Sequence, residues 1–338
     1  MKEITIQDIA LVAKVSKATV SRVLNGTASV NEDKKRAVLE ATQRLGFKPN
    51  VVARSLANGR SMTIGVLTQL IGSPFYDAIA QGVIAGLSGT GYSPIFADGQ
   101  WDTNEGVDAI RALAGRRIDG LVLIGGAVTP DDINSLCGDI PTVVVARNLR
   151  SDRHHCIYMD NVEGGYLATK HLIEHGHRNI AIILGVAHHP DAVDRFEGYT
   201  KALREAGIAL DSGLIVDGDF SAESGVRAVD DLCTRDQPFT AIFAANDMTA
   251  FGASLALFRR SVRVPEDVSI VGFDDQLEAA FVTPPLTTVH QPAREMGAQA
   301  SQAVLELIDG KSLTLSPVRG QLQVRESVAR PPGDAAAD

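Results

Sequence analysis

From residue 62 onward, short runs of β-branched and other apolar residues alternate with longer, alanine-rich amphipathic stretches. The apolar runs occupy residues 62–68, 93–98, 120–125, 142–147, 179–185, 241–246 and 268–275. Continuous short apolar runs are typical of parallel strands that are buried on both faces. The amphipathic stretches, such as 75–91 and 193–207, end in glycine, which suits a helix C-terminus. The alternation predicts an α/β fold with doubly wound parallel sheets.

The number of βα units is too large for one comfortable sheet, and the pattern restarts near residue 161. We therefore expect two lobes, residues 61–160 and 161–289. A segment at about 290–318 should return to the first lobe, and a tail at about 319–330 should finish a sheet in the second. Ligands of such sheets bind outside the carboxyl ends of the strands, so two facing lobes predict a ligand-binding cleft.

The first 47 residues follow a different pattern, with three short helices expected at 5–13, 17–24 and 31–46. Thr5 and Ser16 are suitable N-caps for the first two helices. A small apolar core is expected from Ile9, Ala10, Val15, Val20 and either Val23 or Leu24. The outward positions of the second helix are expected to be Lys17, Ala18, Ser21 and Arg22. This arrangement predicts a helix-turn-helix, whose second helix enters the major groove of DNA. An ordinary three-helix scaffold with a solvated second helix is the alternative.

Charge is distributed unevenly along the chain. The formal net charge is −9, yet residues 1–60 hold 11 lysines and arginines against five acidic residues, which gives +6 there and −15 for the remainder. A basic segment joined to an acidic body indicates that the first 60 residues contact a polyanion. Residues 48–60 are a weakly helical basic segment with Arg54 and an exposed Leu56. They are interpreted either as a helix that inserts Leu56 into the minor groove or as a plain linker.

Composition excludes several classes of protein. The three cysteines are widely spaced, without a CxxC pair, so neither a disulfide framework nor a structural zinc site is expected. The first residues lack the apolar run of a signal peptide, and no segment approaches 18 consecutive apolar residues. We expect a cytoplasmic protein that makes no contact with a membrane.

Seven segments, taken in order, resemble the lactose-repressor (LacI/GalR) family of bacterial transcription regulators. They are TIQDIALVAKVSKATVSRVLNG, RLGFKPNVVARSLANGR, DNVEGGYLATKHLIEHGHRNIAII, RFEGY, FAANDMTAFGA, SIVGFDD and PPLTTVHQP. The resemblance covers essentially the whole chain. It implies a homodimer, sometimes a tetramer, with a helix-turn-helix headpiece (1–47) and a hinge helix and linker (48–60). It also implies a two-lobed periplasmic-binding-protein-like core that senses a small molecule. The C-terminus lacks a heptad repeat, which argues against a tetramerising coiled coil.

The resemblance also implies roles for individual headpiece residues. The residues that the resemblance implies contact DNA phosphates are Thr5, Ser16, Thr19, Ser21 and Asn25. Base-reading positions are matched by Lys17, Ala18 and Arg22, and hinge contacts with DNA by Asn50, Arg54 and Leu56, the last at the centre of the operator. Lys14 departs from the family, which has glycine in this turn. If Lys14 is left-handed, it costs about 1 kcal/mol relative to glycine.

Aromatic and planar polar residues mark a candidate effector site in the core. Phe75, Tyr76, Trp101 and Phe220 could stack on the apolar face of a sugar. The resemblance matches Arg195, Asn246 and Asp274 to positions that hydrogen-bond the effector, and weaker candidates are Asp98, Arg147 and Asp191. A mono- or disaccharide is the expected effector, with a purine or nucleoside as the alternative because aromatic stacking serves both.

Enzymatic and metal chemistry find no support in the sequence. His171, His175 and His177 have a suggestive spacing, but no acidic residue or cysteine nearby completes a metal site. There is no P-loop or GxGxxG motif. Asp274 and Asp275 are adjacent on a strand, so they point to opposite faces and cannot share one reacting bond. We expect no cofactor and no enzyme. A soluble sugar-binding or sugar-processing protein is the competing class, for which the basic N-terminal segment would have no role.

Overall fold

The computed structural model describes residues 4–25, 30–47, 60–149, 154–187, 189–235 and 237–332. The chain divides into two compact units, residues 1–62 and 63–338. Among the described helices, none is both long and apolar enough to cross a membrane.

The first unit contains the three helices that the sequence predicts. They are α1 (Ile6–Val12), α2 (Lys17–Asn25) and α3 (Glu32–Leu45). Each begins after a capping residue. The Thr5 backbone N–H donates to Asp8 Oδ2 at 2.8 Å, and Ser16 Oγ accepts from the Thr19 backbone N–H at 3.1 Å. Asn31 caps α3 in the same way. The buried core consists of Ile9, Ala10, Val20, Val38 and Ala41.

The turn between α1 and α2 contains Lys14 with φ = 54°. Left-handed backbone favours glycine, so the expected strain at this lysine is present. Lys14 is also exposed, and its cation is therefore available in the turn that precedes α2.

The first lobe of the second unit is a five-stranded parallel sheet in the order β2-β1-β3-β4-β5. Its strands are β1 (Thr63–Thr68), β2 (Ser93–Asp98), β3 (Gly120–Ile124), β4 (Thr142–Val145) and β5 (His155–Ile157). Its helices are α5 (Pro74–Leu87), α6 (Thr103–Gly115), α7 (Pro130–Cys137) and α12 (Ala293–Ile308). Apolar residues from both faces of the sheet pack against these helices, as expected for a doubly wound lobe.

The second lobe is a six-stranded sheet in the order β11-β10-β9-β8-β6-β7, parallel except for β11. Its strands are β6 (Ile180–Ile183), β7 (Ile215–Val216), β8 (Ala241–Ala244), β9 (Ser269–Asp274), β10 (Thr287–His290) and β11 (Gln321–Gln323). Its α-helices are α8 (Asn161–Glu174), α9 (Pro190–Glu205), α10 (Ala222–Thr234) and α11 (Asp247–Arg259). Two 3₁₀ turns complete it, η1 (Ser212–Leu214) and η2 (Leu277–Ala280). The sequence pattern did not identify β5 and β7, which have only three and two residues.

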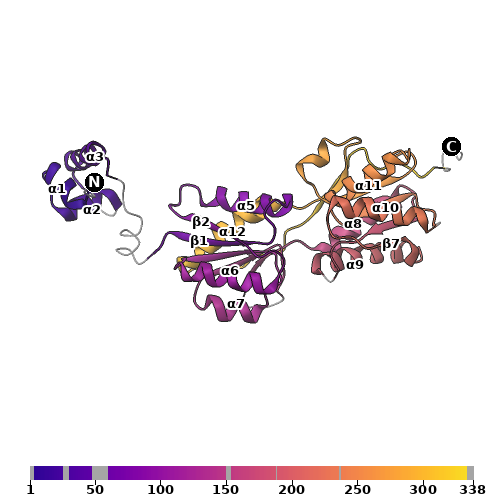
Figure 1. Cartoon of the computed structure of the whole chain (residues 1–338), viewed down its shortest axis with the longest axis horizontal. Coiled ribbons are helices and arrows are strands. Elements are labelled where there is room, and N and C mark those ends of the chain that lie inside the picture. Colours follow the sequence, from indigo (N-terminus) through magenta and orange to yellow (C-terminus); the bar gives the residue numbers. More distant parts are fainter. Residues whose placement is uncertain are drawn as a thin grey trace. The chain divides into compact units, whose positions relative to one another are not determined.

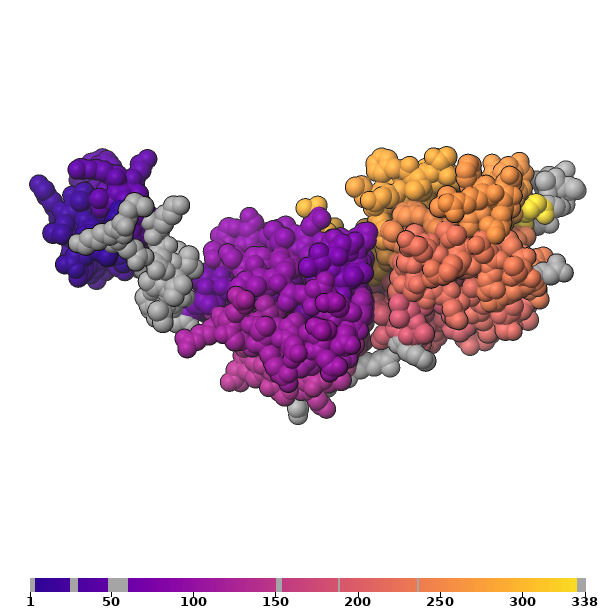
Figure 2. All heavy atoms as spheres, viewed as in Figure 1, coloured from indigo at the N-terminus to yellow at the C-terminus, as the bar shows by residue number. Residues whose placement is uncertain are grey.

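Three segments connect the lobes: β5 to α8, β10 to α12, and α12 to β11. Figure 1 shows α12, in orange, beside α5 in the first lobe although it lies near the end of the chain. Glycines allow this close packing, because a Cβ on Gly82 would lie 2.0 Å from the Arg294 carbonyl oxygen. Met159 and Val318 form a parallel bridge where the first and third segments run together. In Figure 2 the colour changes from purple to pink and orange at the boundary between the lobes.

Candidate functional site

Two adjoining cavities are lined by residues from both lobes. The smaller, about 300 Å³, is lined by Phe75, Tyr76, Arg195, Phe220, Asn246 and Asp274 among others, and we call it the aromatic compartment. The larger, about 780 Å³, is lined by Arg147, Asn148, Tyr158, Asp160, Asn161, Asp194, Glu197 and Gln291 among others, and we call it the polar compartment. Trp101, His189 and Asp191 line both cavities. The structure thus brings eight of the ten expected effector residues to the aromatic compartment.

A row of aromatic rings crosses the cleft from the first lobe to the second. Ring centroids are 5.6 Å apart between Tyr76 and Trp101, 4.6 Å between Trp101 and His189, and 5.5 Å between His189 and Phe220. The interplanar angles of these pairs are 62°, 70° and 84°, so each contact is edge to face. Neighbouring rings in this row are therefore not stacked on each other.

Backbone strain concentrates at the same residues. Trp101 has φ = 58°, Phe220 has φ = 67° and Asp274 has φ = 109°, all in the left-handed region that non-glycine residues rarely adopt. Strained backbone of this kind is typical of functional sites, where the surrounding packing holds it. Gly185 provides the space for Phe220, since a Cβ at residue 185 would lie 2.1 Å from its ring.

Arg195 is the central cation of the aromatic compartment and is only 4% exposed. Its Nε donates to Asn161 Oδ1 at 2.9 Å and its Nη1 donates to the Ala245 carbonyl oxygen at 2.5 Å. The guanidinium carbon lies 3.7 Å from the centroid of the Phe273 ring. These contacts fix the guanidinium plane in a cation–π geometry, so Arg195 is preorganised to receive a polar ligand.

Asp274 is the matching carboxylate at the end of β9. It accepts from Gln291 Nε2 at 2.7 Å and from Gln276 Nε2 at 3.4 Å. Burial raises the pKa of Asp274 to about 6, and the nearby Arg195 guanidinium limits the rise. Gln276 Oε1 is buried without a hydrogen-bond partner among the described residues. A ligand hydroxyl would satisfy this acceptor.

Asn246, which was expected to hydrogen-bond the effector, makes two side-chain hydrogen bonds within the protein. Its Oδ1 accepts from the Thr249 backbone N–H at 2.9 Å and so caps α11, while its Nδ2 donates to the Phe220 carbonyl oxygen at 3.0 Å. Both ends of the amide are therefore engaged within the protein. Asn246 lines the compartment and holds the strained Phe220 loop in place.

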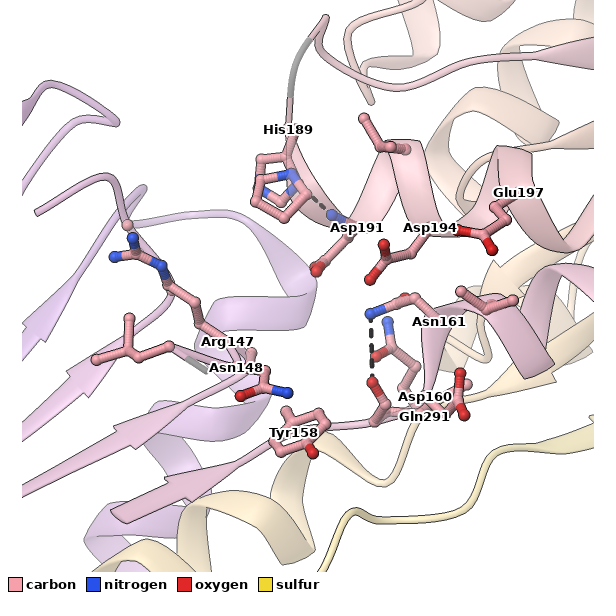
Figure 3. Close-up of a pocket in the computed structure, with 18 of the residues that line it drawn as sticks. Arg147, Asn148, Tyr158, Asp160, Asn161, His189, Asp191, Asp194, Glu197 and Gln291 are labelled. Carbon is pink, nitrogen blue, oxygen red and sulfur yellow. Dashed lines mark hydrogen bonds between the residues drawn. The ribbon is translucent and has the colours of Figure 1, made fainter. Parts of the chain in front are cut away.

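The polar compartment lies on the other side of Trp101 and His189. Figure 3 shows Asp191 and Asp194 reaching into it from α9, Asn161 from the start of α8 and Tyr158 from the first connecting segment, with Arg147 on the side of the first lobe. Arg147 Nη1 donates to the Val128 carbonyl oxygen at 2.7 Å. The expected residue Arg147 therefore belongs to this compartment rather than to the aromatic one.

Burial and nearby cations set the charge state where the compartments meet. Burial, together with the positive charges of Arg195 and Arg147, lowers the pKa of His189 to about 4, so this ring is neutral near pH 7. Burial raises the pKa of Asp191, whereas the same two guanidinium groups lower it. His189 Nδ1 accepts from the Asp191 backbone N–H at 3.2 Å, which fixes the ring at the start of α9.

Asp98 was expected in the site, but the structure places it outside both compartments. Its carboxylate accepts from the backbone N–H groups of Ile71, at 2.9 Å, and Gln100, at 2.9 Å. These bonds tie together two loops of the first lobe. Asp98 thus orders the loop that carries Trp101.

Sequence reasoning missed His189, Asn161, Gln276 and Gln291. His189 follows β6 and precedes the first residue of α9, which is the same strand-end signal that identified Phe75 and Tyr76. Asn161 and Gln291 lie where the chain passes between lobes, and a linear pattern carries no signal for that position.

The adjacent carboxylates Asp274 and Asp275 have separate partners, as their strand positions predict. Asp275 accepts from Arg325 Nη2 at 2.5 Å and lies 2.9 Å from His290 Nδ1. Of the three histidines considered for a metal, His177 is hydrogen-bonded to Thr240 Oγ1 at 2.9 Å and to the Ala329 carbonyl oxygen at 2.8 Å. In the described part of the chain, no group of three potential metal ligands comes together.

The headpiece exposes most of the residues that were expected to contact DNA. Thr5, Ser16, Lys17, Ala18 and Arg22 are exposed or partly exposed, while Thr19 and Ser21 are half-buried. A groove of about 490 Å³ runs past Lys14, Ser16, Thr19 and Lys34. The side chain of Asn25 and the residues Asn50, Arg54 and Leu56 lie outside the described part of the chain.

Comparison with known proteins agrees with this organisation. The model of the lacI family of bacterial regulatory proteins matches residues 5–50, and that of a periplasmic binding protein-like domain matches residues 169–328. A curated relative, the HTH-type transcriptional repressor PurR of Haemophilus influenzae (strain PittEE), is 38% identical over 91% of this chain and 92% of its own length. The PurR of Photobacterium profundum is 35% identical over 96% of this chain and 98% of its own length.

Solved structures extend the similarity to the whole fold. A lac repressor dimer bound to operator and the anti-inducer ONPF has a TM-score of 0.87 at 27% identity, covering 97% of this chain and 100% of that chain. A complex of the transcriptional regulator CelR with cellobiose has a TM-score of 0.72 at 34% identity, covering 96% of this chain and 100% of that chain. The relatives thus span both the headpiece and the two-lobed core, and their names are those of transcriptional regulators. This chain belongs to the lacI family of bacterial regulatory proteins.

Proposed function

We propose that this chain is a cytoplasmic repressor that binds a palindromic operator as a homodimer and releases or engages it in response to a sugar. The observation that carries the proposal is the aromatic compartment. There a buried guanidinium and a buried carboxylate, Arg195 and Asp274, share the lining with the rings of Phe75, Tyr76, Trp101 and Phe220. Planar charged groups hydrogen-bond vicinal hydroxyls, and ring faces cover the apolar face of a sugar.

A purine or nucleoside is the second candidate, and the PurR names of the curated relatives favour it. The charged pair Arg195 and Asp274 favours a sugar instead, because a guanidinium and a carboxylate can hydrogen-bond vicinal hydroxyls. The unpartnered acceptor Gln276 Oε1 also suits a hydroxyl donor.

DNA binding is assigned to the exposed face of α2 and the residues around it. Lys17, Ala18 and Arg22 are proposed to read base edges, and Thr5, Ser16, Thr19, Ser21 and Asn25 to contact phosphates. Asn50, Arg54 and Leu56 are proposed to act at the operator centre. A dimer presents two such headpieces, so a palindromic operator mirrors its two-fold symmetry.

Ligand control follows from differential affinity. A sugar can change operator affinity only if it binds one arrangement of the two lobes better than another. Arg195 and Asp274 belong to the second lobe, whereas Tyr76 and Trp101 belong to the first. A ligand that contacts all four residues stabilises the arrangement in which they surround it.

A thermal-shift screen of the full chain tests the proposal, with monosaccharides, disaccharides, free purine bases and nucleosides as probes. A ligand present at 100 times its Kd stabilises the protein by about 2.7 kcal/mol. A probe that shifts the unfolding transition is then added to a gel shift with DNA selected from a random library. Stabilisation by a saccharide that also changes DNA affinity supports the proposal. Stabilisation only by purines or nucleosides would replace the sugar with the second candidate.

A further inference from the structure

We propose that the polar compartment is a second subsite, which takes an uncharged, hydroxyl-rich unit covalently joined to the ring in the aromatic compartment. The inference rests on the proposed sugar effector and narrows it to a disaccharide or a comparable glycoside. At about 780 Å³ the polar compartment exceeds the aromatic one, at about 300 Å³, and Trp101, His189 and Asp191 line both. A single hexose occupies one compartment and leaves the other to solvent.

Two buried amides present hydrogen-bonding groups to the polar compartment. Gln291 is 4% exposed, and its Nε2 donates to Asp274 Oδ1 at 2.7 Å. Gln291 lines only the polar compartment of the two, and its Oε1 is the end of the amide that the bond to Asp274 does not use. This oxygen is an acceptor for a ligand hydroxyl.

Asn161 supplies the complementary donor. It is 8% exposed, and its Oδ1 accepts from Arg195 Nε at 2.9 Å. Its Nδ2 has only a long contact, 3.5 Å, to the Met159 carbonyl oxygen. A donor and an acceptor thus face the polar compartment from amides whose other ends hold Arg195 and Asp274. Occupying the second subsite therefore also supports the two charged groups of the first.

Charge selects against an anionic second unit. Among the described residues, four carboxylates line the polar compartment, those of Asp160, Asp191, Asp194 and Glu197, against one guanidinium, Arg147. Asp160 accepts from the Glu163 backbone N–H at 2.9 Å, so it also caps α8. The neutral His189 adds no positive charge near pH 7. A phosphate placed here would meet like charge in a partly enclosed site, whereas a neutral hydroxylated ring would not.

The first test compares matched saccharides on the full chain. Trp101 is the sole tryptophan and lines both compartments, so its fluorescence reports occupation of either one. The probe sets are glucose with cellobiose and maltose, galactose with lactose, and the 6′-phosphates of the three disaccharides. We expect the best disaccharide to bind about tenfold or more tightly than either of its monosaccharides. Its phosphate should lose about tenfold or more in affinity. Equal affinity for a disaccharide and its monosaccharides would overturn the second subsite.

The second test changes the charge of the compartment. The double variant Asp194→Asn/Glu197→Gln removes two negative charges from its lining, and Asp217→Asn/Glu223→Gln removes two from exposed positions in the same lobe outside both compartments. We expect the first variant to bind the phosphorylated disaccharide about tenfold more tightly than the parent and the monosaccharide unchanged. An equal gain in affinity for the phosphorylated disaccharide in the second variant would show a general charge effect. It would refute the proposed selection against an anionic unit by the polar compartment. Binding of purines with no saccharide bound would contradict the proposed sugar effector itself.

Discussion

Arg195 and Asp274 face each other in the aromatic compartment with Nη2 and Oδ1 3.9 Å apart. That separation is too long for a hydrogen bond, although both residues are almost fully buried, at 4% and 8% exposure. Each is held by other groups, Arg195 by Asn161 and Ala245, and Asp274 by Gln291. The pair therefore retains hydrogen-bonding capacity at the centre of the compartment, where a ligand hydroxyl could bridge the two charges.

Replacing either member of this pair should abolish the response to effector. Arg195→Ala or Asp274→Ala removes a charged hydrogen bond to the ligand, worth on the order of 1.5 to 3 kcal/mol. Operator affinity without effector should remain largely intact, because both residues lie in the second unit of the chain and not in the headpiece. Gel shifts with and without effector measure both quantities. Arg263→Ala is the matched control, since Arg263 is exposed and pairs with Asp267. If the effector changes operator affinity in both site variants as much as in the parent, the effector binds elsewhere.

The stability of the core should depend on pH through Asp274. Its pKa is raised to about 6 in the folded protein from 3.8 in the unfolded chain, so between these values the folded state binds more protons. Stability from this group is therefore present below about pH 4 and is lost as the pH rises through 6, by roughly 3 kcal/mol. Urea unfolding of the parent and of Asp274→Asn from pH 4 to 7 measures the difference. If the free energy of unfolding changes with pH by the same amount in the parent and in Asp274→Asn, the raised pKa is contradicted.

Arg22 and Lys14 should affect DNA binding in different ways. Arg22 lies on α2, where a bidentate contact with guanine discriminates by roughly 1 to 3 kcal/mol, so Arg22→Ala should relax preference at one base pair per half-site. Lys14→Ala should weaken binding to all sequences alike and lower the salt slope by about one unit. Titration against a half-site library at two salt concentrations separates the two effects. If both variants lose the same DNA affinity on every sequence, the headpiece binds DNA only through its positive charge.

The same lysine provides a test of backbone strain. Lys14→Gly relieves the left-handed conformation at φ = 54° and should stabilise the headpiece by about 1 kcal/mol. It also removes a cation, so affinity for every DNA sequence should fall. Hydrogen exchange at the amides of α1 and α2 in the full chain measures the stability, and filter binding measures the affinity. Faster exchange in the variant would show that the lysine conformation is not strained.

Packing between α8 and α9 should control the position of Arg195. A Cβ at Gly165 would lie 2.2 Å from the Arg195 carbonyl oxygen, so Gly165→Ala must separate the two helices. We expect a loss of roughly 1 to 3 kcal/mol in stability together with weaker effector binding. Gly115→Ala is the control, because a Cβ there meets nothing within 4 Å and the residue ends α6. Thermal unfolding and the Trp101 fluorescence titration report the two effects. If Gly165→Ala binds the effector as tightly as the parent does, the packing between α8 and α9 does not control the position of Arg195.

The periodicity of the sequence determined most of the fold. Runs of residues buried on both faces of a sheet have few alternatives to parallel strands, and seven of them appear in the structure within two residues of the expected bounds. The helix-turn-helix could also be predicted from the sequence, because Ser16 and Asn31 cap their helices through local backbone contacts. The strands β5 and β7 were missed because three and two residues carry no measurable period.

Within the proposed effector site, the sequence predicted the aromatic rings and the charged residues that follow strands, because strand ends converge at one edge of each sheet. Only the tertiary structure decided that Asp98 turns away to bind two backbone amides, that Asn246 is engaged at both ends, and that Arg147 lines a separate compartment. Gln291 and Asn161 enter the site because the chain crosses between the lobes beside it. Local patterns encode burial and helix ends, which depend on neighbours in sequence, whereas the contact between Asn161 and Arg195 joins residues far apart in the chain and exists only after α8 and α9 are packed in the second lobe.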